Sequence, residues 1–419
     1  MKKQTKAIRI QTKKSSNREH SVPLYLTSSF AFESAEQGKA LFEETEEGNI
    51  YSRFSNPNVT EFVEKVCMLE NAEDGIATGT GMAAVFASMA GLLKSGDHIV
   101  ACRALFGSAH QIITQILSKW GITHTYVDAT ATEAEWEEAI KANPTTGTPA
   151  ARMVYLETPS NPGLELVDLT MLARLKAKYH FILNVDNCFA TPILQTPIDL
   201  GADLSIHSAT KFMDGQGRVL GGIVVGSKEL IQPIRFFARH TGPSLSPFNA
   251  WVLSKSLETL ELRMERHCRN AQQLAEALEA LPDVDRVLYP FLPSHPQYEL
   301  AKQQMSAGGA IVTIELAGGF ERVNAFFDAL QIPTLSSNLG DSRTIVTNPN
   351  TTTHAKLKPE EKAALGITPG LIRISVGLES IDDLIEDFTQ AIEKSADVVA
   401  ADVVAADVVT ADVVKENVA

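Results

Sequence analysis

The chain contains few cysteines and no long apolar run. Cys67, Cys102, Cys188 and Cys268 are its four cysteines, and no two of them form a CxxC pair, so neither a disulfide framework nor a zinc knuckle is expected. No stretch of about 20 apolar residues predicts a transmembrane helix. The basic N-terminus also lacks the apolar core of a secretory signal. These absences predict a cytoplasmic protein with free thiols and no membrane partner.

The chain also has fewer basic residues than acidic ones. Lys and Arg number 37 against 51 for Asp and Glu, which gives a net charge of -14. Proteins that bind phosphate backbones concentrate Lys and Arg, so we expect no nucleic-acid partner. The 419 residues, 44% of them hydrophobic, are enough for two domains with a large core.

Signatures of a nicotinamide site and of a metal site are missing. The segment Thr78–Ala84 contains a GxG, but no GxGxxG follows a strand there, since Ala83 and Ala84 occupy the last two places. His207 and His240 are not spaced like metal ligands, so we expect no metal. His207 follows an apolar strand, where a packed or hydrogen-bonded histidine is the more common case.

The central part of the chain alternates helices with short apolar strands. Helix starts are indicated by Asn58 as a cap, by a capping box of Thr132 with Glu135, and by Ser246-Pro247 opening a long helical stretch through Leu281. Continuous apolar strands between helices predict an α/β fold with a mostly parallel sheet covered on both faces. The strands are expected at Ile99–Val100, Thr125–Val127, Met153–Leu156, Phe181–Val185, Leu204–Ile206 and Ile223–Val225.

The sequence predicts four parts. They are an extended arm (1–60), a cofactor-binding α/β domain (61–248), a smaller C-terminal α+β domain (249–395) and a low-complexity tail (396–419). The C-terminal domain has expected strands at Ile311–Ile314 and Leu371–Ile374, with helices from Glu321 and Ile381. The tail repeats Ala-Asp-Val-Val with a spacing that fits neither helix nor strand, which predicts a disordered or weakly helical appendage.

Three groups of residues together indicate pyridoxal 5'-phosphate. Lys211 follows an apolar strand and two hydroxyls, Ser208 and Thr210, as a lysine does that holds this cofactor's aldehyde beside a bound phosphate. Asp186 closes another apolar strand, where a carboxylate can keep a pyridine nitrogen protonated. Gly81 and its neighbours lie ahead of a helix whose free N–H groups can hold a phosphate.

Each of these residues also has a simpler interpretation. A lysine after a strand is often a solvated charge, an aspartate there is more often a cap, and a glycine turn often serves only close packing. Cys188 is expected to be a small buried thiol. The carboxyl edge of a parallel sheet favours the functional interpretation of Asp186 and Lys211, because ligands of open α/β sheets bind at that edge.

The chain resembles the cystathionine gamma-synthase family of pyridoxal-phosphate enzymes of sulfur amino acid metabolism. The resemblance covers roughly residues 5 to 394 and rests on ordered motifs, which are Tyr51–Pro57, Gly81-Met82, Glu157–Pro162, Asp186-Asn187, Ser208–Lys211 and Arg373–Gly377. It implies the aspartate aminotransferase-like fold, called fold type I. It also implies a homotetramer built from dimers.

The resemblance assigns roles to individual residues. It implies that Tyr51 and Arg53 reach the cofactor phosphate of the adjacent subunit, that Met82 lies in the phosphate-binding turn, and that Asn161 lies near the cofactor phenolic oxygen. Arg373 matches the arginine that pairs with the substrate α-carboxylate. The same loop-and-strand region makes Ser337 and Asn338 further candidates for substrate binding, although many relatives have serine where Asn338 stands.

Two departures from the family pattern narrow the activity. The usual ring-stacking tyrosine is replaced by Phe106, so the phenol that moves protons in lyases is absent. The turn Asp214–Gly222 and the stretch Asn338–Ser342 look like those of O-succinylhomoserine sulfhydrylases. The resemblance therefore implies that an amino-acid ester and sulfide give homocysteine and succinate, with Lys211 as the catalytic base.

Other activities remain open at this point. O-acetylhomoserine sulfhydrylase, cystathionine gamma-synthase and methionine gamma-lyase would share every cofactor residue. A non-catalytic scaffold that binds a phosphorylated ligand would keep the fold without the chemistry. Arg218, Arg235 and Arg239 are candidates for meeting the acyl group, but each is more often structural or solvated.

Overall fold

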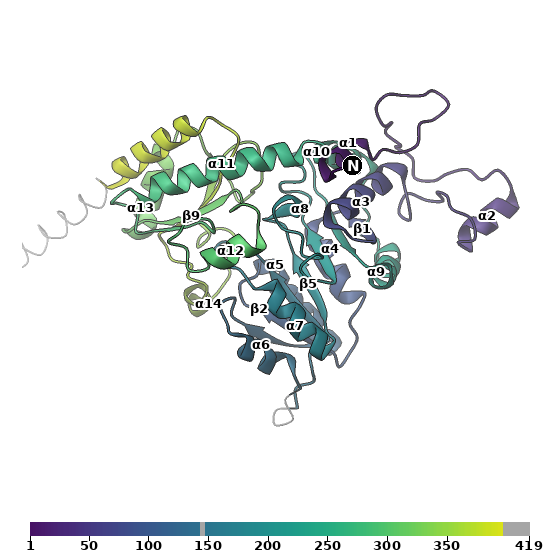
Figure 1. Ribbon diagram of the computed structural model, residues 1–419, viewed down its shortest axis with the longest axis horizontal. Helices are drawn as coiled ribbons and strands as arrows, with labels where there is room; N and C mark the ends of the chain where they lie inside the picture. The colour runs from purple at the N-terminus through teal and green to yellow at the C-terminus, as the bar shows by residue number, and fades with distance from the viewer. Residues whose placement is uncertain (143–146, 397–419) are drawn as a thin grey trace, which may run out of the picture. The chain divides into compact units, whose positions relative to one another are not determined.

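The computed structural model describes residues 1–142 and 147–396, which divide into two compact units (Figure 1). The first unit comprises Met1–Asn161, Glu165–Met264 and Glu299–Ala307, and the second comprises Pro162–Leu164, Glu265–Tyr298 and the chain from Gly308 onward. The predicted tail lies outside the described residues from position 397. Within the described ranges, no helix combines the length and the apolar character needed to cross a bilayer.

The first unit is built on a seven-stranded sheet with the strand order β1-β7-β6-β5-β4-β2-β3. The neighbours from β6 to β3 pair in parallel, whereas β7 is antiparallel to both β6 and β1. The expected mostly parallel sheet is confirmed, with β7 as the exception. The strands are β1 (Asp74–Thr78), β2 (His98–Cys102), β3 (Thr123–Val127), β4 (Met153–Glu157), β5 (Ile182–Asp186), β6 (Leu204–His207) and β7 (Gly222–Gly226).

Strand direction brings the candidate residues to one edge of this sheet. Because β1, β2, β4, β5 and β6 run the same way, their carboxyl ends meet there. Gly81 follows β1, Phe106 follows β2, Asn161 follows β4, Asp186 ends β5 and Lys211 follows β6. Ligands of open α/β sheets bind at this carboxyl edge.

Helices cover both faces of the sheet. Asn184 of β5 donates from Nδ2 to Ser88 Oγ of α4 (2.9 Å), and Ser205 of β6 donates from Oγ to Glu70 of α3 (3.0 Å). Asn184 pairs with Leu204, so Asn184 and Ser205 point to opposite faces and α3 and α4 lie on opposite sides. The main apolar core lies on the α4 side and includes Val85, Ile113, Tyr155, Ile206 and Ile234.

Helices begin close to the three starts that the sequence predicts in this part of the chain, with two differences, and the other helices were not predicted. The helices of this part are α1 (Lys3–Arg9), α2 (Ala35–Phe42), α3 (Pro57–Glu70), α4 (Gly81–Ala90), α5 (Gly107–Gln111), α6 (Glu133–Ile140), α7 (Leu169–Tyr179), α8 (Thr191–Leu194), α9 (Lys228–Thr241), α10 (Pro247–Leu257), α11 (Leu260–Glu279) and α12 (Tyr298–Gln304). The capping box of Thr132 with Glu135 is confirmed. The stretch predicted from Ser246 to Leu281 divides into α10 and α11.

The cap of α3 was predicted at the wrong asparagine. Asn56, not Asn58, is the N-cap, and its side chain accepts a hydrogen bond from the Asn58 backbone N–H (3.0 Å). Asn58 is buried inside the helix, where its side chain accepts from the Tyr25 N–H (2.8 Å) and donates to the Pro23 carbonyl (2.8 Å). The second asparagine therefore fixes the arm to α3 instead of capping the helix.

The second unit contains a five-stranded sheet with the order β10-β11-β12-β9-β8, which confirms the smaller C-terminal α+β architecture. Its core packs α11, α13 and the helix at 381–396 against β9 and β12, around residues such as Leu274, Phe326 and Phe388. The elements are β8 (Arg286–Leu288), β9 (Ile311–Glu315), α13 (Gly319–Ala329), β10 (Thr334–Leu335), β11 (Ile345–Thr347), α14 (Pro359–Ala364) and β12 (Leu371–Ser375).

Gly222 permits a close backbone approach at the carboxyl edge of the first sheet. It pairs with Thr78 of β1, and a Cβ at Gly222 would lie 2.1 Å from the carbonyl oxygen of Thr80. Thr80 is the N-cap of α4. The absence of a side chain at Gly222 therefore determines where α4 begins.

We predict that Gly222→Ala displaces Thr80 and lowers the free energy of unfolding by about 1–3 kcal/mol, the range for overpacking a tight site. Urea unfolding of the protein measures this change. Gly79→Ala is the matched control, because a Cβ there meets only the Ser244 carbonyl oxygen, at 3.3 Å. Equal stability of the two variants would contradict the prediction.

Candidate active site

The N-terminus of α4 forms a tight turn against the end of β6. Thr80 caps the helix by accepting from the Ala83 N–H at 3.1 Å, which leaves the N–H groups of Gly81 and Met82 at the start of the first turn. A Cβ on Gly81 would lie 2.6 Å from Ser208 Cβ and 2.7 Å from Ser208 Oγ. Only glycine fits there, and the turn brings backbone donors beside the Ser208 hydroxyl, as an anion such as a phosphate requires.

Lys211 lies in the turn that follows β6. Its backbone N–H donates to the Ser208 carbonyl (3.1 Å), and its side chain is half-buried. The hydroxyl of Thr210 accepts from the Gly221 N–H (3.1 Å) and contacts the Gly221 carbonyl (3.3 Å). Thr210 therefore connects the lysine turn to the segment that leads into β7.

Asp186, Cys188 and Lys211 are close enough to influence one another electrostatically. Burial raises the pKa of Asp186 to about 6, against a smaller opposing effect of His207 and of the Cys188 N–H, which donates to Asp186 Oδ1 at 3.1 Å. Burial and the Asp186 charge also raise the pKa of the Cys188 thiol, whereas Lys211 lowers it. A carboxylate with a raised pKa is stabilised in its charged form by a nearby cation.

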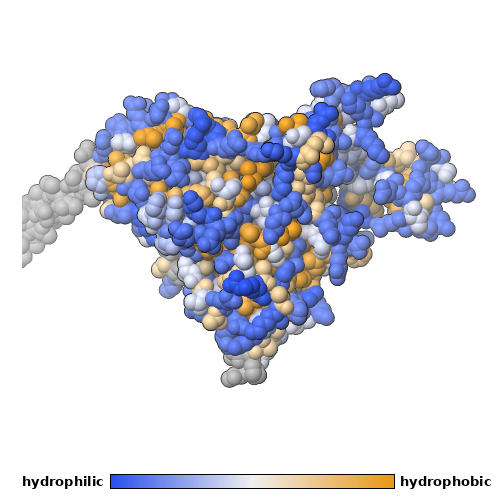
Figure 2. Space-filling view, viewed as in Figure 1, coloured by the Kyte–Doolittle hydropathy of each residue, from blue (hydrophilic) through white to orange (hydrophobic). Residues whose placement is uncertain are grey.

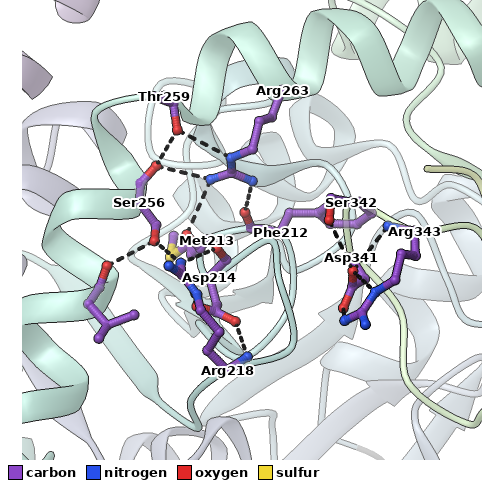
Figure 3. A network of polar contacts seen from close by, with 11 residues as sticks. Phe212, Met213, Asp214, Arg218, Ser256, Thr259, Arg263, Asp341, Ser342 and Arg343 are labelled. Carbon is purple, nitrogen blue, oxygen red and sulfur yellow. Dashed lines mark hydrogen bonds and ion pairs between the residues drawn. The ribbon is translucent and has the colours of Figure 1, made fainter. Parts of the chain in front are cut away.

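Two arginines brace the segment that follows Lys211 (Figure 3). Arg263 donates from Nη1 to the Phe212 carbonyl (2.6 Å), and a Cβ at Gly215 would lie 2.2 Å from the same Nη1. Burial lowers the pKa of Arg263 to about 10, while Asp214 opposes this effect. Arg218 donates to Asp214 Oδ1 from Nε at 3.1 Å. Arg218, one of the candidates for the acyl group, therefore has a structural role in the turn.

Phe106 follows β2 and Asn161 follows β4. Both strands lie on the side of β5 that faces away from β6. The Phe106 N–H donates to Glu157 Oε2 at 3.0 Å, so the last residue of β4 fixes the start of α5. Asn161 is 7% exposed. Sequence reasoning missed Glu157, although its place at the end of the strand beside β5 is a usable signal.

Tyr51 and Arg53 lie elsewhere in this chain. The Arg53 guanidinium donates from Nη1 to the Arg239 carbonyl at the end of α9, and it lies 5.4 Å from the Tyr51 ring and 4.9 Å from the Phe54 ring. Among the described residues, neither makes a hydrogen bond to the turn at Gly81 or to Ser208. The structure of one chain therefore does not bring these two residues to the phosphate turn.

The other two arginine candidates are held by acidic partners. Arg235 donates to Asp74 Oδ1 from Nη2 at 2.6 Å, and Arg239 donates to Glu44 Oε1 from Nη1 at 3.0 Å. Both interactions are structural within the first unit.

In the second unit, Arg373 lies on β12 between β9 and β11. Its side chain is 1% exposed, and Nη2 donates to the carbonyls of Ser337 and Asn338, each at 3.0 Å. The two candidate substrate residues thus contact Arg373 through their backbones. The guanidinium is held in a fixed orientation, as bidentate recognition of a carboxylate needs.

His354 is a further buried residue of this region that sequence reasoning missed. Burial, together with the charges of Arg373 and Lys362, lowers the pKa of His354 to about 4. Its Nδ1 lies 2.8 Å from the Thr353 hydroxyl. A neutral imidazole therefore stands near Arg373 and adds no second positive charge.

The arrangement fits pyridoxal 5'-phosphate. The glycine cradle and hydroxyls suit its phosphate, Lys211 is an amine for its aldehyde, and the Asp186 carboxylate suits a protonated pyridine nitrogen. No group of three or more His, Cys, Asp or Glu side chains suited to a metal is present in the part of the chain that the structure describes.

Known proteins share both the sequence and the fold. The model of the family "Cys/Met metabolism PLP-dependent enzyme" matches residues 4–393. O-succinylhomoserine sulfhydrylase of Pseudomonas aeruginosa is 43% identical over 388 residues, which are 93% of this chain and 94% of that protein. L-methionine gamma-lyase of Fusobacterium nucleatum subsp. polymorphum is 42% identical over 376 residues, 89% of this chain and 93% of that protein.

A solved structure extends the similarity to the whole fold. Cystathionine gamma synthase of Xanthomonas oryzae pv. oryzae, in complex with aminoacrylate and cysteine, superposes with a TM-score of 0.88 at 32% identity and covers 94% of this chain and 99% of that one. The expected fold type I architecture is confirmed. From these matches and the residues at the sheet edge, the chain belongs to the Cys/Met metabolism family of PLP-dependent enzymes, with pyridoxal 5'-phosphate as its cofactor.

Proposed function

We propose that this enzyme converts O-succinylhomoserine and hydrogen sulfide into homocysteine and succinate. The reaction breaks the bond between the γ-carbon and the ester oxygen and forms a bond between the γ-carbon and sulfur. Succinate leaves with the electron pair of the broken bond. No oxidant or reductant is required, since the exchange is a substitution.

The cofactor residues have separate roles in this proposal. The N–H groups of Gly81 and Met82, with the hydroxyls of Ser208 and Thr210, hold the phosphate at the end of the sheet. Bound pyridoxal phosphate supplies an aldehyde that links covalently to an amine and a ring that withdraws electrons from the adjacent carbon. The Asp186 carboxylate would keep a positive charge on the ring nitrogen, and Asn161 would contact the phenolic oxygen.

Lys211 is the proton carrier in this proposal. With the substrate bound in place of this lysine, Lys211 Nζ would remove the proton from the α-carbon. The same Nζ then moves a proton at the β-carbon, which weakens the bond from the γ-carbon to the ester oxygen. After sulfide has added at the γ-carbon, Lys211 would return one proton to the β-carbon and one to the α-carbon, and homocysteine would be released.

Phe106 is the observation that carries the choice among activities. A phenyl ring retains a face for stacking on the cofactor but has no hydroxyl that can transfer a proton, which disfavours the lyases that use a tyrosine here. Similarity alone does not separate the activities, because the sulfhydrylase and methionine gamma-lyase relatives are 43% and 42% identical to this chain. The residue at position 106 therefore favours γ-replacement.

Arg373 is proposed to bind the α-carboxylate of the substrate. Its guanidinium is oriented by the backbone carbonyls of Ser337 and Asn338. The neutral His354 leaves Arg373 as the charge that attracts the carboxylate. The proposal includes Ser337 and Asn338 as substrate-binding residues through the loop that they share with this arginine.

The arm supports assembly into dimers and, as the resemblance implies, a homotetramer. Figure 1 shows the segment that carries α2 projecting from the helices around the seven-stranded sheet. Figure 2 shows that the surface of this segment is mostly hydrophilic and includes some hydrophobic residues. Leu26 is 69% exposed and Phe42 is 61% exposed. A cavity of about 880 Å³ is lined by Phe42 and Phe54 of the arm and by Phe236 of α9.

Incubation of the holoenzyme with O-succinylhomoserine and sulfide, with the same ester and cysteine, and with methionine alone tests the activity. We expect homocysteine and succinate as the main products, at least about tenfold faster than cystathionine or 2-oxobutanoate form, a difference of about 1.4 kcal/mol in activation free energy. Chromatography with mass detection measures all the products. Cystathionine or 2-oxobutanoate as the dominant product would contradict the proposal.

We predict that Lys211→Ala removes the visible absorbance that arises when lysine holds the cofactor and slows turnover by roughly a hundred- to ten-thousand-fold, the contribution of a general base. Borohydride should bleach the absorbance of the wild type and leave the cofactor attached to Lys211. Lys228→Ala, at the exposed start of α9, is the matched control. A wild type that stays colourless with added cofactor would favour the scaffold alternative.

Subunit mixing tests whether Arg53 acts across the dimer. We expect Arg53→Ala to weaken cofactor binding by roughly ten- to a hundredfold, as the loss of a charged hydrogen bond does. Hybrids of Arg53→Ala with Lys211→Ala should regain activity at a limiting cofactor concentration, because one of their two sites is then intact. If Arg53 serves its own chain, the hybrids stay as inactive as the parent variants.

A further inference from the structure

Three buried donors converge on one oxygen of Glu70. Glu70 is the last residue of α3 and is fully buried. Its Oε1 accepts from Asn187 Nδ2 (3.0 Å) and Ser205 Oγ (3.0 Å), and it lies 2.6 Å from His207 Nε2. None of these four residues contributes to the proton transfers of the proposed reaction.

The donors belong to the ends of two adjacent strands that carry the site. Asn187 directly follows Asp186 at the end of β5, and His207 is the last residue of β6, just before the segment that ends in Lys211. A single carboxylate from a helix on one face of the sheet therefore ties both strand ends together. Glu70 therefore contacts the residue next to Asp186 and the strand that leads to Lys211.

A second layer of hydrogen bonds extends this contact to β4. Gln195 donates from Nε2 to Asn187 Oδ1 (2.9 Å) and to the carbonyl of Thr158, the residue after β4 (2.9 Å). Gln304 donates from Nε2 to Gln195 Oε1 at 3.0 Å. The members are buried or nearly so, so each lost hydrogen bond leaves a buried polar group unsatisfied.

Glu70 and His207 are an acid and a base in direct contact. Glu70 Oε2 is buried and makes no hydrogen bond, an arrangement that is costly for a carboxylate unless a cation compensates it. His207 is the basic group in contact with Glu70. Positive charge on His207 also acts on Asp186, whose pKa burial raises and His207 lowers.

Other titratable groups surround Asp186. Tyr155 and Glu157 come from β4, Cys188 from the loop after β5, and Lys211 from the turn after β6. Burial raises the pKa of the Cys67 thiol, and the charge of Glu70, which is also in α3, adds to this effect. Of these groups, Lys211 and His207 are the basic ones, and Lys211 is bound to the cofactor in the resting enzyme that we propose.

We propose that Glu70 and His207 form a positioning pair: Glu70 fixes the ends of β5 and β6, and the charge it supports on His207 keeps the Asp186 carboxylate ionised for the ring nitrogen of the cofactor. Both residues act through Asp186. This inference rests on the cofactor roles in the proposed function and does not depend on which substrate the enzyme uses.

Glu70→Gln tests the charge while preserving the shape and the acceptor oxygen. With less positive charge on His207, Asp186 takes up a proton at higher pH, so we expect the pH-dependent change in the absorbance of the bound cofactor to move up by about one pH unit. Cofactor affinity near pH 6 should fall by up to about tenfold, because the ionised fraction of a carboxyl group falls by that factor when its pKa rises by about one. His207→Asn, which keeps a donor for Glu70 but cannot be charged, should shift the absorbance in the same direction.

A second measurement uses the protein without cofactor. A carboxylate whose pKa is raised on folding contributes stability at pH values below its unfolded pKa, and this contribution is lost as pH rises through the folded value, which is about 6 for Asp186. Glu70→Gln should move this loss of stability to higher pH. In an Asp186→Asn background the loss is absent, and Glu70→Gln should no longer move it.

Glu61→Gln is the matched control from the same helix. Glu61 is also buried and accepts from Ser254 Oγ (2.6 Å) and the Thr12 N–H (2.8 Å), and it pairs with Lys65 at 3.2 Å, without contact to the ends of β5 or β6. It should lower stability but leave the cofactor titration unchanged. If Glu70→Gln behaves like Glu61→Gln in both measurements, the positioning role is wrong, whatever the product analysis shows.

Discussion

Backbone hydrogen bonding between β5 and β6 sets the distance between the acid and the amine of the active site. Asn184 pairs with Leu204 and Asp186 with Ile206, so the strand end that carries Asp186 lies beside the one that leads to Lys211. Side chains alternate between the faces of a strand, so a register shift of one residue would turn Asp186 to the opposite face. The chemistry of the cofactor thus depends on a register fixed by buried apolar residues far from any reacting atom.

The two faces of the sheet contribute differently to the site. On one face, α4 places its first turn beside Ser208 and packs against the main apolar core. On the other face, α3 sends Glu70 to the strand ends and holds the arm through Asn58. The lysine turn is braced separately by Arg263, whose buried guanidinium is satisfied by backbone carbonyls. The site is therefore rigid on three sides before any ligand binds.

The sequence offered signals for the candidate site residues but none for several of the residues that support them. Asp186 and Lys211 could be chosen as candidates because an apolar strand ends at or just before each of them. The end of an apolar run can be recognised in the sequence alone. Strand β1 (Asp74–Thr78) was missed because its polar and small residues lack a strand signal, and the direction of β7 was missed because apolar runs look alike in parallel and antiparallel strands. Glu70 gave no signal, since a glutamate at a helix end usually faces water.

The pairing of β1 with β7 has a consequence for how the enzyme matures. Thr78 and Gly222 are partners, so the turn at Gly81 and the lysine at 211 come together only when these two distant segments join. Closing so large a loop carries an entropic cost that local contacts cannot offset, which places this step late in folding. A chain still on the ribosome cannot assemble the phosphate cradle until β7 has emerged. The cofactor site thus depends on two segments that are far apart in the sequence, and it is complete only when both are in place.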